Sequence, residues 1–214
     1  MKPPQFDRPG SWRILFASAL TLIDDLATRV NDPRWSFGGG TVLMLRLNHR
    51  HSKDIDLFVP DPQYLGFVTP RLSDAAETLT TDYQEGALFV KLLLAAGEID
   101  FVVGPPLTDS PWDLVAYKGR VIKVETCAEI VAKKMHHRGD QAKARDLFDL
   151  CAVAELEPAA IPVAKPFMER HARAFLAGLH ERRDLAKADL DKIERIAFDR
   201  TFDECVAVAE RILG

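Results

Sequence analysis

The chain has 214 residues, and 47% of them are hydrophobic, which is enough to fill the core of one large domain or two small ones. A formal net charge of −4 at pH 7 excludes a uniformly basic nucleic-acid coat, so any contact with nucleic acid must come from a local patch. The three cysteines, Cys127, Cys151 and Cys205, have neither CxxC spacing nor histidine companions, which argues against a disulfide framework and a zinc site and favours a reducing cytoplasm.

The N-terminal part alternates between helical and strand patterns. Residues 1–10 are polar and proline-rich, unlike a signal peptide, and no stretch approaches the ~20 apolar residues that span a bilayer, so we expect a cytoplasmic protein without membrane contact. Apolar residues at helical spacing predict a helix over 12–30, which ends at Asp32-Pro33. The pattern then predicts a strand at 35–37, a tight turn at 38–40, a helix at 41–47 and a strand at 54–59.

More strands follow, and then only helices. A helix is expected around 72–79, strands at 87–95 and 98–103 joined through Ala96-Gly97, and another strand at 120–124. From residue 126 the pattern predicts helices at about 126–138, 143–156, 165–180, 184–197 and 203–213. This change predicts a boundary between domains 1–125 and 126–214, and the last helices, which carry no motif, predict a packed bundle.

Three glycines, Gly38, Gly39 and Gly40, separate the predicted strand at 35–37 from the helix that follows. Backbone N–H groups in such a turn can approach an anion closely, and a helix N-terminus adds partial positive charge, so a phosphate would fit there. A lone Gly-Gly-Gly is more often only a tight turn that needs positive φ. The phosphate reading gains weight here because a pair of carboxylates begins fourteen residues later.

Those carboxylates, Asp54 and Asp56, stand two residues apart on one predicted strand, so they should share a face and repel each other unless a cation compensates them. Magnesium commonly joins one or two carboxylates to substrate phosphates, although a solvated edge strand with a polar face would also fit. Asp100, inside the strand at 98–103, is a candidate third ligand; alternatively it is a strand-end acid facing water beside Glu98. Three carboxylates, two cations and a triphosphate would make a site for in-line nucleotidyl transfer.

Four motifs together resemble those of a known family. Gly38-Gly39-Gly40-Thr41 followed by Ser52-Lys53-Asp54-Ile55-Asp56 resembles the signature of the DNA polymerase β-like nucleotidyltransferase superfamily. The Arg-x-Ser of Arg50 and Ser52 is similar to that of abortive-infection toxins of the AbiEii/AbiGii type. Residues 129–134, with Lys134, and residues 145–150, with Asp146, resemble the lysine motif and the Arg-Asp-x-x-Asp-Leu motif of that branch, so the resemblance covers about residues 37–150.

The resemblance implies an α+β fold, in which a mixed β-sheet nucleotidyltransferase domain flanked by helices is followed by an all-helical C-terminal domain that completes the active site. It implies a magnesium-dependent enzyme that moves NMP from an NTP such as ATP to an acceptor and releases pyrophosphate. RNA, tRNA in several members, would be the acceptor, and a cognate antitoxin the partner. Mg²⁺ would be held by Asp54, Asp56 and Asp100, and the catalytic set would add Lys134 and Asp146. The nucleotide would contact the residues Gly38, Gly39, Gly40, Thr41, Arg50, Ser52 and Lys134.

Helical geometry bears on the lysine motif without the family. Lys134 falls in the middle of the apolar stripe of the helix at 126–138, whereas Lys133 falls beside Glu129 on the polar face. A lysine in such a stripe either extends its ammonium to solvent or has an anionic partner, which could be a triphosphate, the acids of the first domain or, equally, an interdomain salt bridge. Asp146 and Asp149 share a face of the next helix and could orient Lys134, bind the acceptor, or pair with Arg138 and Arg145.

Two alternatives stay open at the level of function. The same pocket could bind a nucleotide without turnover, or the enzyme could modify a protein hydroxyl or a small molecule such as an antibiotic. A basic segment favours RNA weakly, although such a run is usually a solvated face; its members are Lys133, Lys134, His136, His137, Arg138, Lys143 and Arg145.

Overall fold

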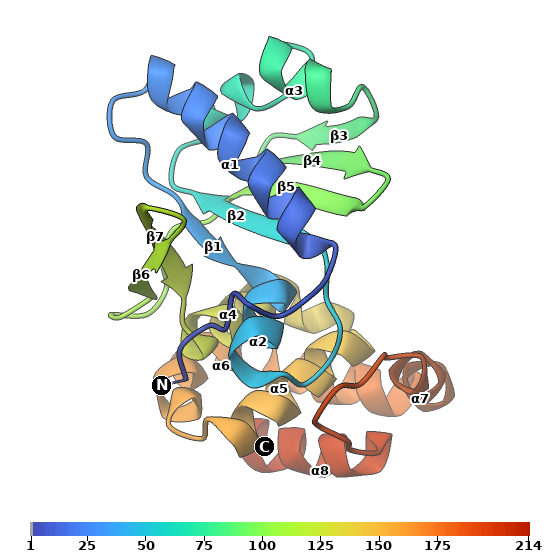
Figure 1. Cartoon of the computed structure of the whole chain (residues 1–214). Helices are drawn as coiled ribbons and strands as arrows, with labels where there is room; N and C mark the ends of the chain where they lie inside the picture. Colours follow the sequence, from blue (N-terminus) through green and yellow to red (C-terminus); the bar gives the residue numbers. More distant parts are fainter. Residues whose placement is uncertain (1) are drawn as a thin grey trace.

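The computed structural model describes residues 2–214, and its centre is a seven-stranded mixed sheet in the order β3-β4-β5-β2-β1-β7-β6 (Figure 1). β2 and β5 are parallel, as are β1 and β7, whereas β1 with β2, β4 with β5, β3 with β4 and β6 with β7 are antiparallel. The strands are β1 (Ser36–Gly38), β2 (Ile55–Val59), β3 (Tyr83–Gly86), β4 (Phe89–Leu94), β5 (Gly97–Val103), β6 (Trp112–Tyr117) and β7 (Arg120–Glu125).

The two faces of the sheet differ because side chains alternate along each strand. Ile55, Leu57, Ile99 and Phe101 are buried on the face that α1 (Trp12–Arg29) covers (Figure 1). The opposite face carries the intervening residues of β2 and β5, among them two acids, and only its lower part lies under helices. The shorter helices of this part are α2 (Gly39–Leu47), η1 (Pro62–Phe67) and α3 (Asp74–Leu79).

All the helices after residue 126 gather at one end of the sheet (Figure 1). They are α4 (Cys127–Arg138), η2 (Gly139–Gln141), α5 (Ala144–Leu156), α6 (Ala160–Glu181), α7 (Arg183–Asp191) and α8 (Phe202–Leu213). α4 packs against α6 and α5, and α2 reaches from the sheet to contact both α4 and α5. Buried apolar residues of the sheet and of the helices form one continuous core cluster. α2 and α4 therefore hold the sheet and the C-terminal helices in a fixed relation.

The predicted α+β fold with a mixed sheet and helices is confirmed, and so are most of the elements. Sequence patterns missed the edge strands β3 and β6, whose exposed residues give little apolar alternation. They also placed the start of α6 five residues late, at 165 instead of Ala160, because Pro166 lies inside this helix. α7 ends at Asp191 and not at 197, because the backbone of residues 196 and 197 turns back to bond with Asn48 and His49.

No helix within the described residues has both the length and the apolar character that crossing a membrane requires.

Candidate active site

The two acids on the open face stand side by side. Asp56 of β2 and Asp100 of β5 are register partners on neighbouring parallel strands, and Gly38 and Lys91 continue the same row on either side. The expected pairing of Asp56 with Asp100 is therefore present in the sheet itself. Asp54 lies one residue before β2, and its Oδ1 accepts a hydrogen bond of 3.1 Å from the backbone N–H of Glu98.

The carboxylate of Asp56 is poorly compensated. Burial, together with the nearby charge of Asp100, raises the pKa of Asp56 to about 6, and within residues 2–214 no side chain hydrogen-bonds to it. The pKa of Asp100 is also raised, mainly by burial, although Lys91 Nζ lies 2.8 Å from its Oδ2 and opposes the shift. Lys91 pairs with Glu98 as well, so this lysine is the cation that the row of acids already holds.

This donor set fits a divalent cation. Two carboxylates in register carry more negative charge than their surroundings neutralise, and hard cations prefer such oxygen ligands. The described residues contain no cluster of three or more His, Cys, Asp or Glu side chains already arranged around one point, and Lys91 stands where it competes for Asp100. Asp56 and Asp100 would thus hold the ion, with Lys91 moving aside.

The glycines at the start of α2 lie directly against these acids. Gly39 has φ of +71°, and a Cβ at this position would overlap with the carboxylate of Asp56. A Cβ at Gly38 would overlap with the carboxylate of Glu125, and one at Gly40 would come within 3.0 Å of the Arg50 and Ser52 side chains. Close packing alone therefore requires glycine at 38 and 39, and Gly38 is the last residue of β1 instead of part of a separate turn.

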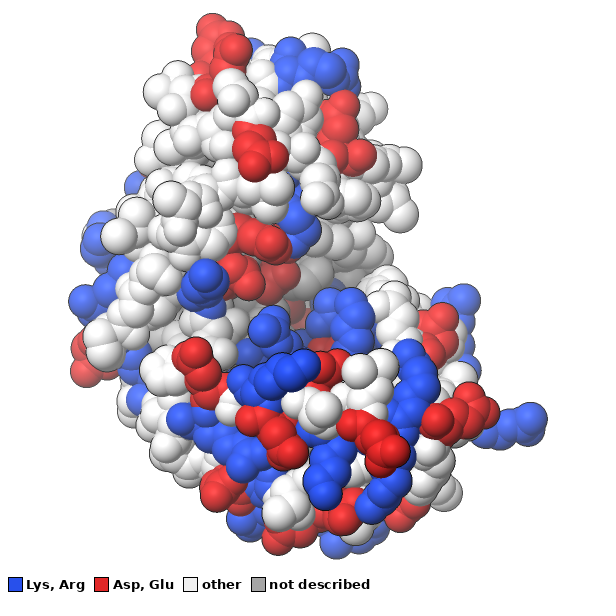
Figure 2. Space-filling view, turned by 90° about the vertical axis from the view of Figure 1, so that its right-hand side faces the viewer, with Lys and Arg blue, Asp and Glu red and all other residues white. Residues whose placement is uncertain are grey.

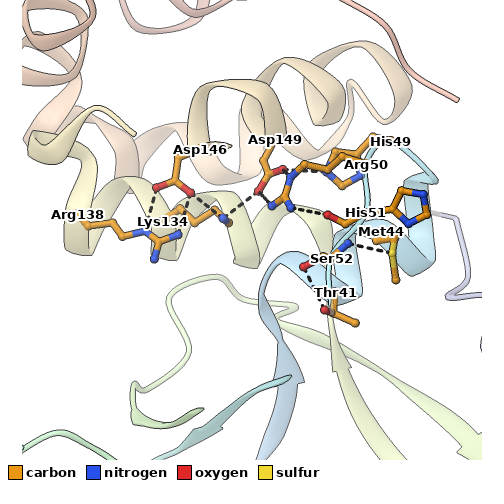
Figure 3. A network of polar contacts seen from close by, with 10 residues as sticks. All are labelled: Thr41, Met44, His49, Arg50, His51, Ser52, Lys134, Arg138, Asp146 and Asp149. Atoms are coloured by element: carbon orange, nitrogen blue, oxygen red, sulfur yellow. Dashed lines mark hydrogen bonds and ion pairs between the residues drawn. The ribbon is translucent and has the colours of Figure 1, made fainter. Parts of the chain in front are cut away.

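Thr41 and Ser52 connect α2 to the segment that leads into β2. Thr41 is fully buried, and its Oγ1 donates a hydrogen bond of 2.6 Å to the Asp54 carbonyl and lies 3.1 Å from Ser52 Oγ (Figure 3). The Ser52 N–H in turn lies 3.3 Å from the sulfur of Met44. These contacts position Asp54 and the strand behind it, so Thr41 holds the loop from within the protein.

A chain of ion pairs forms the helical wall of the site (Figure 3). Lys134 Nζ lies 2.7 Å from Asp146 Oδ1 and 2.9 Å from Asp149 Oδ2. Arg138 holds Asp146 with two bonds of 2.9 and 2.8 Å, and Arg50 holds Asp149 with two bonds of 2.6 and 2.9 Å. Of the partners considered for Lys134, the carboxylates of the neighbouring helix are the ones present, and Arg138, not Arg145, is the arginine on Asp146.

The charges of this wall are compensated. Burial would raise the pKa of Asp149, but Arg50 and Lys134 outweigh it and hold that pKa well below its usual range. The pKa of Asp146 is lowered in the same way by Lys134 and Arg138, against its burial. Burial lowers the pKa of His49 despite the 2.8 Å contact with Asp149.

Sequence reasoning placed Lys134 correctly, facing inward with carboxylate partners, but placed Lys133 wrongly. Lys133 is the more deeply buried of the pair, with 5% of its surface exposed, and it is not on a polar face. Its ammonium lies 2.7 Å from Glu125, 3.4 Å from Glu129 and 3.8 Å from the centroid of the Phe58 ring. The predicted pairing of Lys133 with Glu129 is confirmed. The helical-wheel argument failed for Lys133 because α4 packs against several helices, α6, α5 and α2, and therefore buries more than one stripe.

Glu125 is a site residue that sequence reasoning missed. It ends β7, its Oε1 accepts bonds from Ser36 at 2.9 Å and Lys133 at 2.7 Å, and burial raises its pKa to about 7. Its Oε2 has no hydrogen-bond partner among residues 2–214. The sequence signal that could have indicated Glu125 is its position as an acid at the end of an apolar strand, directly before a helix.

Two clefts of similar size lie next to the site residues described above. The first, of about 340 Å³, lies between the open face of the sheet and α4; it contains Gly39, Gly40, Asp56, Phe58, Lys134 and Arg138. The second, of about 350 Å³, contains Arg50, Ser52, Lys53, Asp54, Arg145 and Lys192. In Figure 2 the molecule is hollowed between its two halves, with acidic side chains on the upper wall and basic side chains on the lower wall.

Comparison with known proteins gives a family match and two similar solved structures. The family described as nucleotidyl transferase AbiEii toxin, type IV toxin–antitoxin system, matches residues 21–211. Two solved structures from Helicobacter pylori are similar at 17% sequence identity. One is described as a candidate nucleotidyltransferase; its TM-score is 0.46, and the alignment covers 92% of this chain and 93% of that chain. The other is JHP933; its TM-score is 0.48, and the alignment covers 90% of this chain and 89% of that chain. No match was found among curated proteins.

Proposed function

The chain belongs to the AbiEii nucleotidyl transferase toxin family, and from this premise we propose that it transfers NMP from an NTP to the hydroxyl of an RNA acceptor with the aid of Mg²⁺. The acceptor oxygen forms a bond to the α-phosphorus, the bond from that phosphorus to the bridging oxygen breaks, pyrophosphate leaves, and the hydroxyl proton passes to solvent. A type IV toxin–antitoxin family implies an antitoxin as the partner that restrains this activity.

The observation that carries the proposal is the register of Asp56 with Asp100 beside the glycines that open α2. Asp56 lines the first cleft, with Asp100 beside it in the sheet, at the place where a triphosphate would meet the helix N-terminus. Mg²⁺ held there would neutralise phosphate charge and stabilise the leaving pyrophosphate. Asp54, fixed by the Glu98 N–H and by the Thr41 bond to its carbonyl, would approach the same ion from the second cleft.

The cations of the helical wall would face the phosphates. Lys134 and Arg138 both line the first cleft, and Asp146 fixes them by direct ion pairs. A phosphate could compete for either cation, because Lys134 and Arg138 each have several N–H donors. Arg50 is held by two bonds to Asp149 and does not line the first cleft, so its effect on the nucleotide would come through the position of Gly40.

Apolar side chains would receive the base. Phe58, Val102 and Phe89 are register partners on three neighbouring strands, two residues along from the row of acids, and all three line the first cleft. Ile130 of α4 lines the cleft from the opposite side. A flat apolar slot beside a polar phosphate site is typical of a nucleotide pocket.

One observation favours a second candidate, a nucleotide-binding module without turnover. The Lys91–Asp100 ion pair occupies an oxygen that the cation would need, and such a pair would persist in a site that binds but does not react. Binding of NTP that Mg²⁺ strengthens, without transfer to any acceptor, would favour this candidate.

The test incubates the protein with each α-³²P-labelled NTP, Mg²⁺, and either total cellular RNA or total cellular protein. We expect label in RNA, and loss of that label by more than about 100-fold in an Asp56→Asn variant, because one ligand charge is gone. Label in protein or in small molecules instead would move the acceptor to those classes. Undiminished labelling by Asp56→Asn would contradict the assignment of the site.

A further inference from the structure

The second cleft lies next to the first but differs from it in chemistry. The two meet at Gly40, where a Cβ would contact Arg50 and Ser52, both of which line the second cleft. Asp56 faces the first cleft and Asp54, two residues earlier, faces the second. The two clefts are therefore lined by acids that lie only two residues apart in the chain.

Basic side chains without partners line the second cleft. His51, Lys53 and Arg145 all border it, and within residues 2–214 none of the three forms an ion pair through its side chain. Lys192 also borders it and pairs only with exposed Asp189, at 2.9 Å. The acids on its rim are Asp54 and Glu194. In contrast, the cations of the first cleft, Lys133, Lys134 and Arg138, are already held by carboxylates.

The wall of this cleft is fixed by backbone hydrogen bonds. The His51 N–H donates to the Glu194 carbonyl at 2.8 Å, the Ile196 N–H to the His49 carbonyl at 3.0 Å, and the Ala197 N–H to the Asn48 carbonyl at 3.0 Å. The segment 192–197, which carries no sequence motif, thus forms one side of the cleft and is tied to the loop that carries His51 and Lys53. The cations are presented from a rigid frame, which reduces the entropy lost on binding.

We propose that the second cleft binds the sugar–phosphate backbone of the RNA acceptor, so that its terminal hydroxyl lies at Asp54 while the NTP occupies the first cleft. This inference rests on the proposed transfer to RNA. In an RNA strand the phosphodiester nearest the terminal hydroxyl is one nucleotide back, and Lys53 and Arg145 line the same cleft as Asp54, where such a phosphate would lie. Flexible cations without protein partners are the groups that phosphates recruit, and each such contact releases counterions.

The test compares the wild type with a Lys53→Ala/Arg145→Ala double variant and with Lys165→Ala, a matched control on the exposed surface of α6 outside both clefts. The probe is a fluorescein-labelled 12-nucleotide oligoribonucleotide with a free 3′ hydroxyl, and its Kd is measured by anisotropy at several salt concentrations. We expect the Kd of the double variant to rise at least ten-fold and its salt slope to fall by about 1.4, since two phosphate contacts are lost. The Kd for NTP with Mg²⁺ should stay within two-fold of the wild type.

Three outcomes would overturn the inference. One is an oligoribonucleotide Kd in the double variant equal to that of Lys165→Ala, with both proteins melting as the wild type does. Another is tighter binding of a polyglutamate peptide than of the oligoribonucleotide at equal salt, because the cleft would then fit an acidic protein. The third is RNA labelling by the double variant with an unchanged KM for the acceptor. If the wild type labels no RNA but the oligoribonucleotide still binds through Lys53 and Arg145, the proposed function fails and the phosphate-binding cleft stands.

Discussion

The two walls of the first cleft are both built from buried charges, yet they are in opposite electrostatic states. On the sheet wall, burial and mutual repulsion raise the pKa of Asp56 and burial raises that of Asp100. On the helical wall, Lys134, Arg138 and Arg50 lower the pKa values of Asp146 and Asp149 despite their burial. The helical wall is complete without a ligand, whereas on the sheet wall Lys91 pairs with Asp100 but no side chain of residues 2–214 hydrogen-bonds to Asp56. Charges that stabilise the fold and charges kept for function can thus be told apart by their compensation.

The largest expected effect is on the helical wall. An Asp149→Asn variant removes the charge that holds Arg50 and Lys134, and a buried pair broken from one side costs about 3–5 kcal/mol of unfolding free energy. Because the pKa of Asp149 is lowered in the folded state, its stabilisation is present above its unfolded pKa of ~3.9 and is lost as the pH falls through the lower folded value.

Urea titrations at pH 7 and at pH 3 measure this loss. The matched control is Asp203→Asn, which removes an exposed ion pair with Arg183 and should change stability by less than about 0.5 kcal/mol. A difference of under about 1 kcal/mol between Asp149→Asn and this control at pH 7 would show that the helical wall is not a stabilising network.

A second, smaller loss of stability is expected at Gly39, where α2 packs against Asp56 of the sheet wall. A Gly39→Ala variant places a Cβ on a residue with φ of +71° and against the Asp56 carboxylate, which should cost about 2 kcal/mol. In a Gly39→Ala/Asp56→Gly double variant the overlap is gone but the backbone strain remains, so only part of the loss should return. Additive effects in this double-mutant cycle would mean that Gly39 does not pack on Asp56.

The sheet wall should respond in the opposite direction. We expect an Asp56→Asn variant to gain about 1–3 kcal/mol of unfolding free energy at pH 8 while it loses transfer. The folded pKa of Asp56, about 6, lies above its model-compound value of 3.8, so the charged form is the costly one. The gain should therefore be full above pH 7 and shrink as the pH falls from 6 to 4. Thermal melts across this range measure it, and an Asp56→Asn protein less stable than the wild type at pH 8 would contradict the contrast between the walls.

The smallest effect concerns the cation that the sheet wall already holds. A Lys91→Met variant keeps the aliphatic length but removes the ammonium from Asp100 and Glu98. We expect the concentration of Mg²⁺ needed for half-maximal transfer to fall about three-fold, because Lys91 no longer competes for Asp100. A rise in that concentration would mean that Lys91 supports the site and does not compete with the metal.

Much of this arrangement could be read from the sequence, for reasons that lie in local periodicity. The alternation in 54–59 and 98–103 predicted the strands of Asp56 and Asp100, and the motif residues indicated the family, which the match over residues 21–211 confirms. The roles of the individual site residues remain predictions. Which strand pairs with which is a tertiary property, so the sequence could not give the register of Asp56 with Asp100.

The failures share a physical cause. Lys133 was placed on a polar face because a helical wheel assumes one buried face, whereas α4 packs against α6, α5 and α2. Glu125 was missed because its role comes from contacts with Gly38, which is distant in sequence, and with Lys133, which lies on the helix that follows. Neither contact leaves a local sequence pattern. The Lys91–Asp100 pair depends on the β4–β5 hairpin register, and no pattern within either strand indicates it.

The central claim, that Asp56 and Asp100 form an incompletely compensated carboxylate pair that binds a divalent cation, is tested most directly by Mn²⁺ binding. Electron paramagnetic resonance of free Mn²⁺, titrated with protein and a saturating non-hydrolysable NTP, compares the wild type with Asp56→Asn and with the matched amide variant Asp203→Asn. We expect the wild type and Asp203→Asn to bind Mn²⁺ equally and Asp56→Asn to bind at least ten-fold more weakly. Equal binding by all three proteins would contradict the claim.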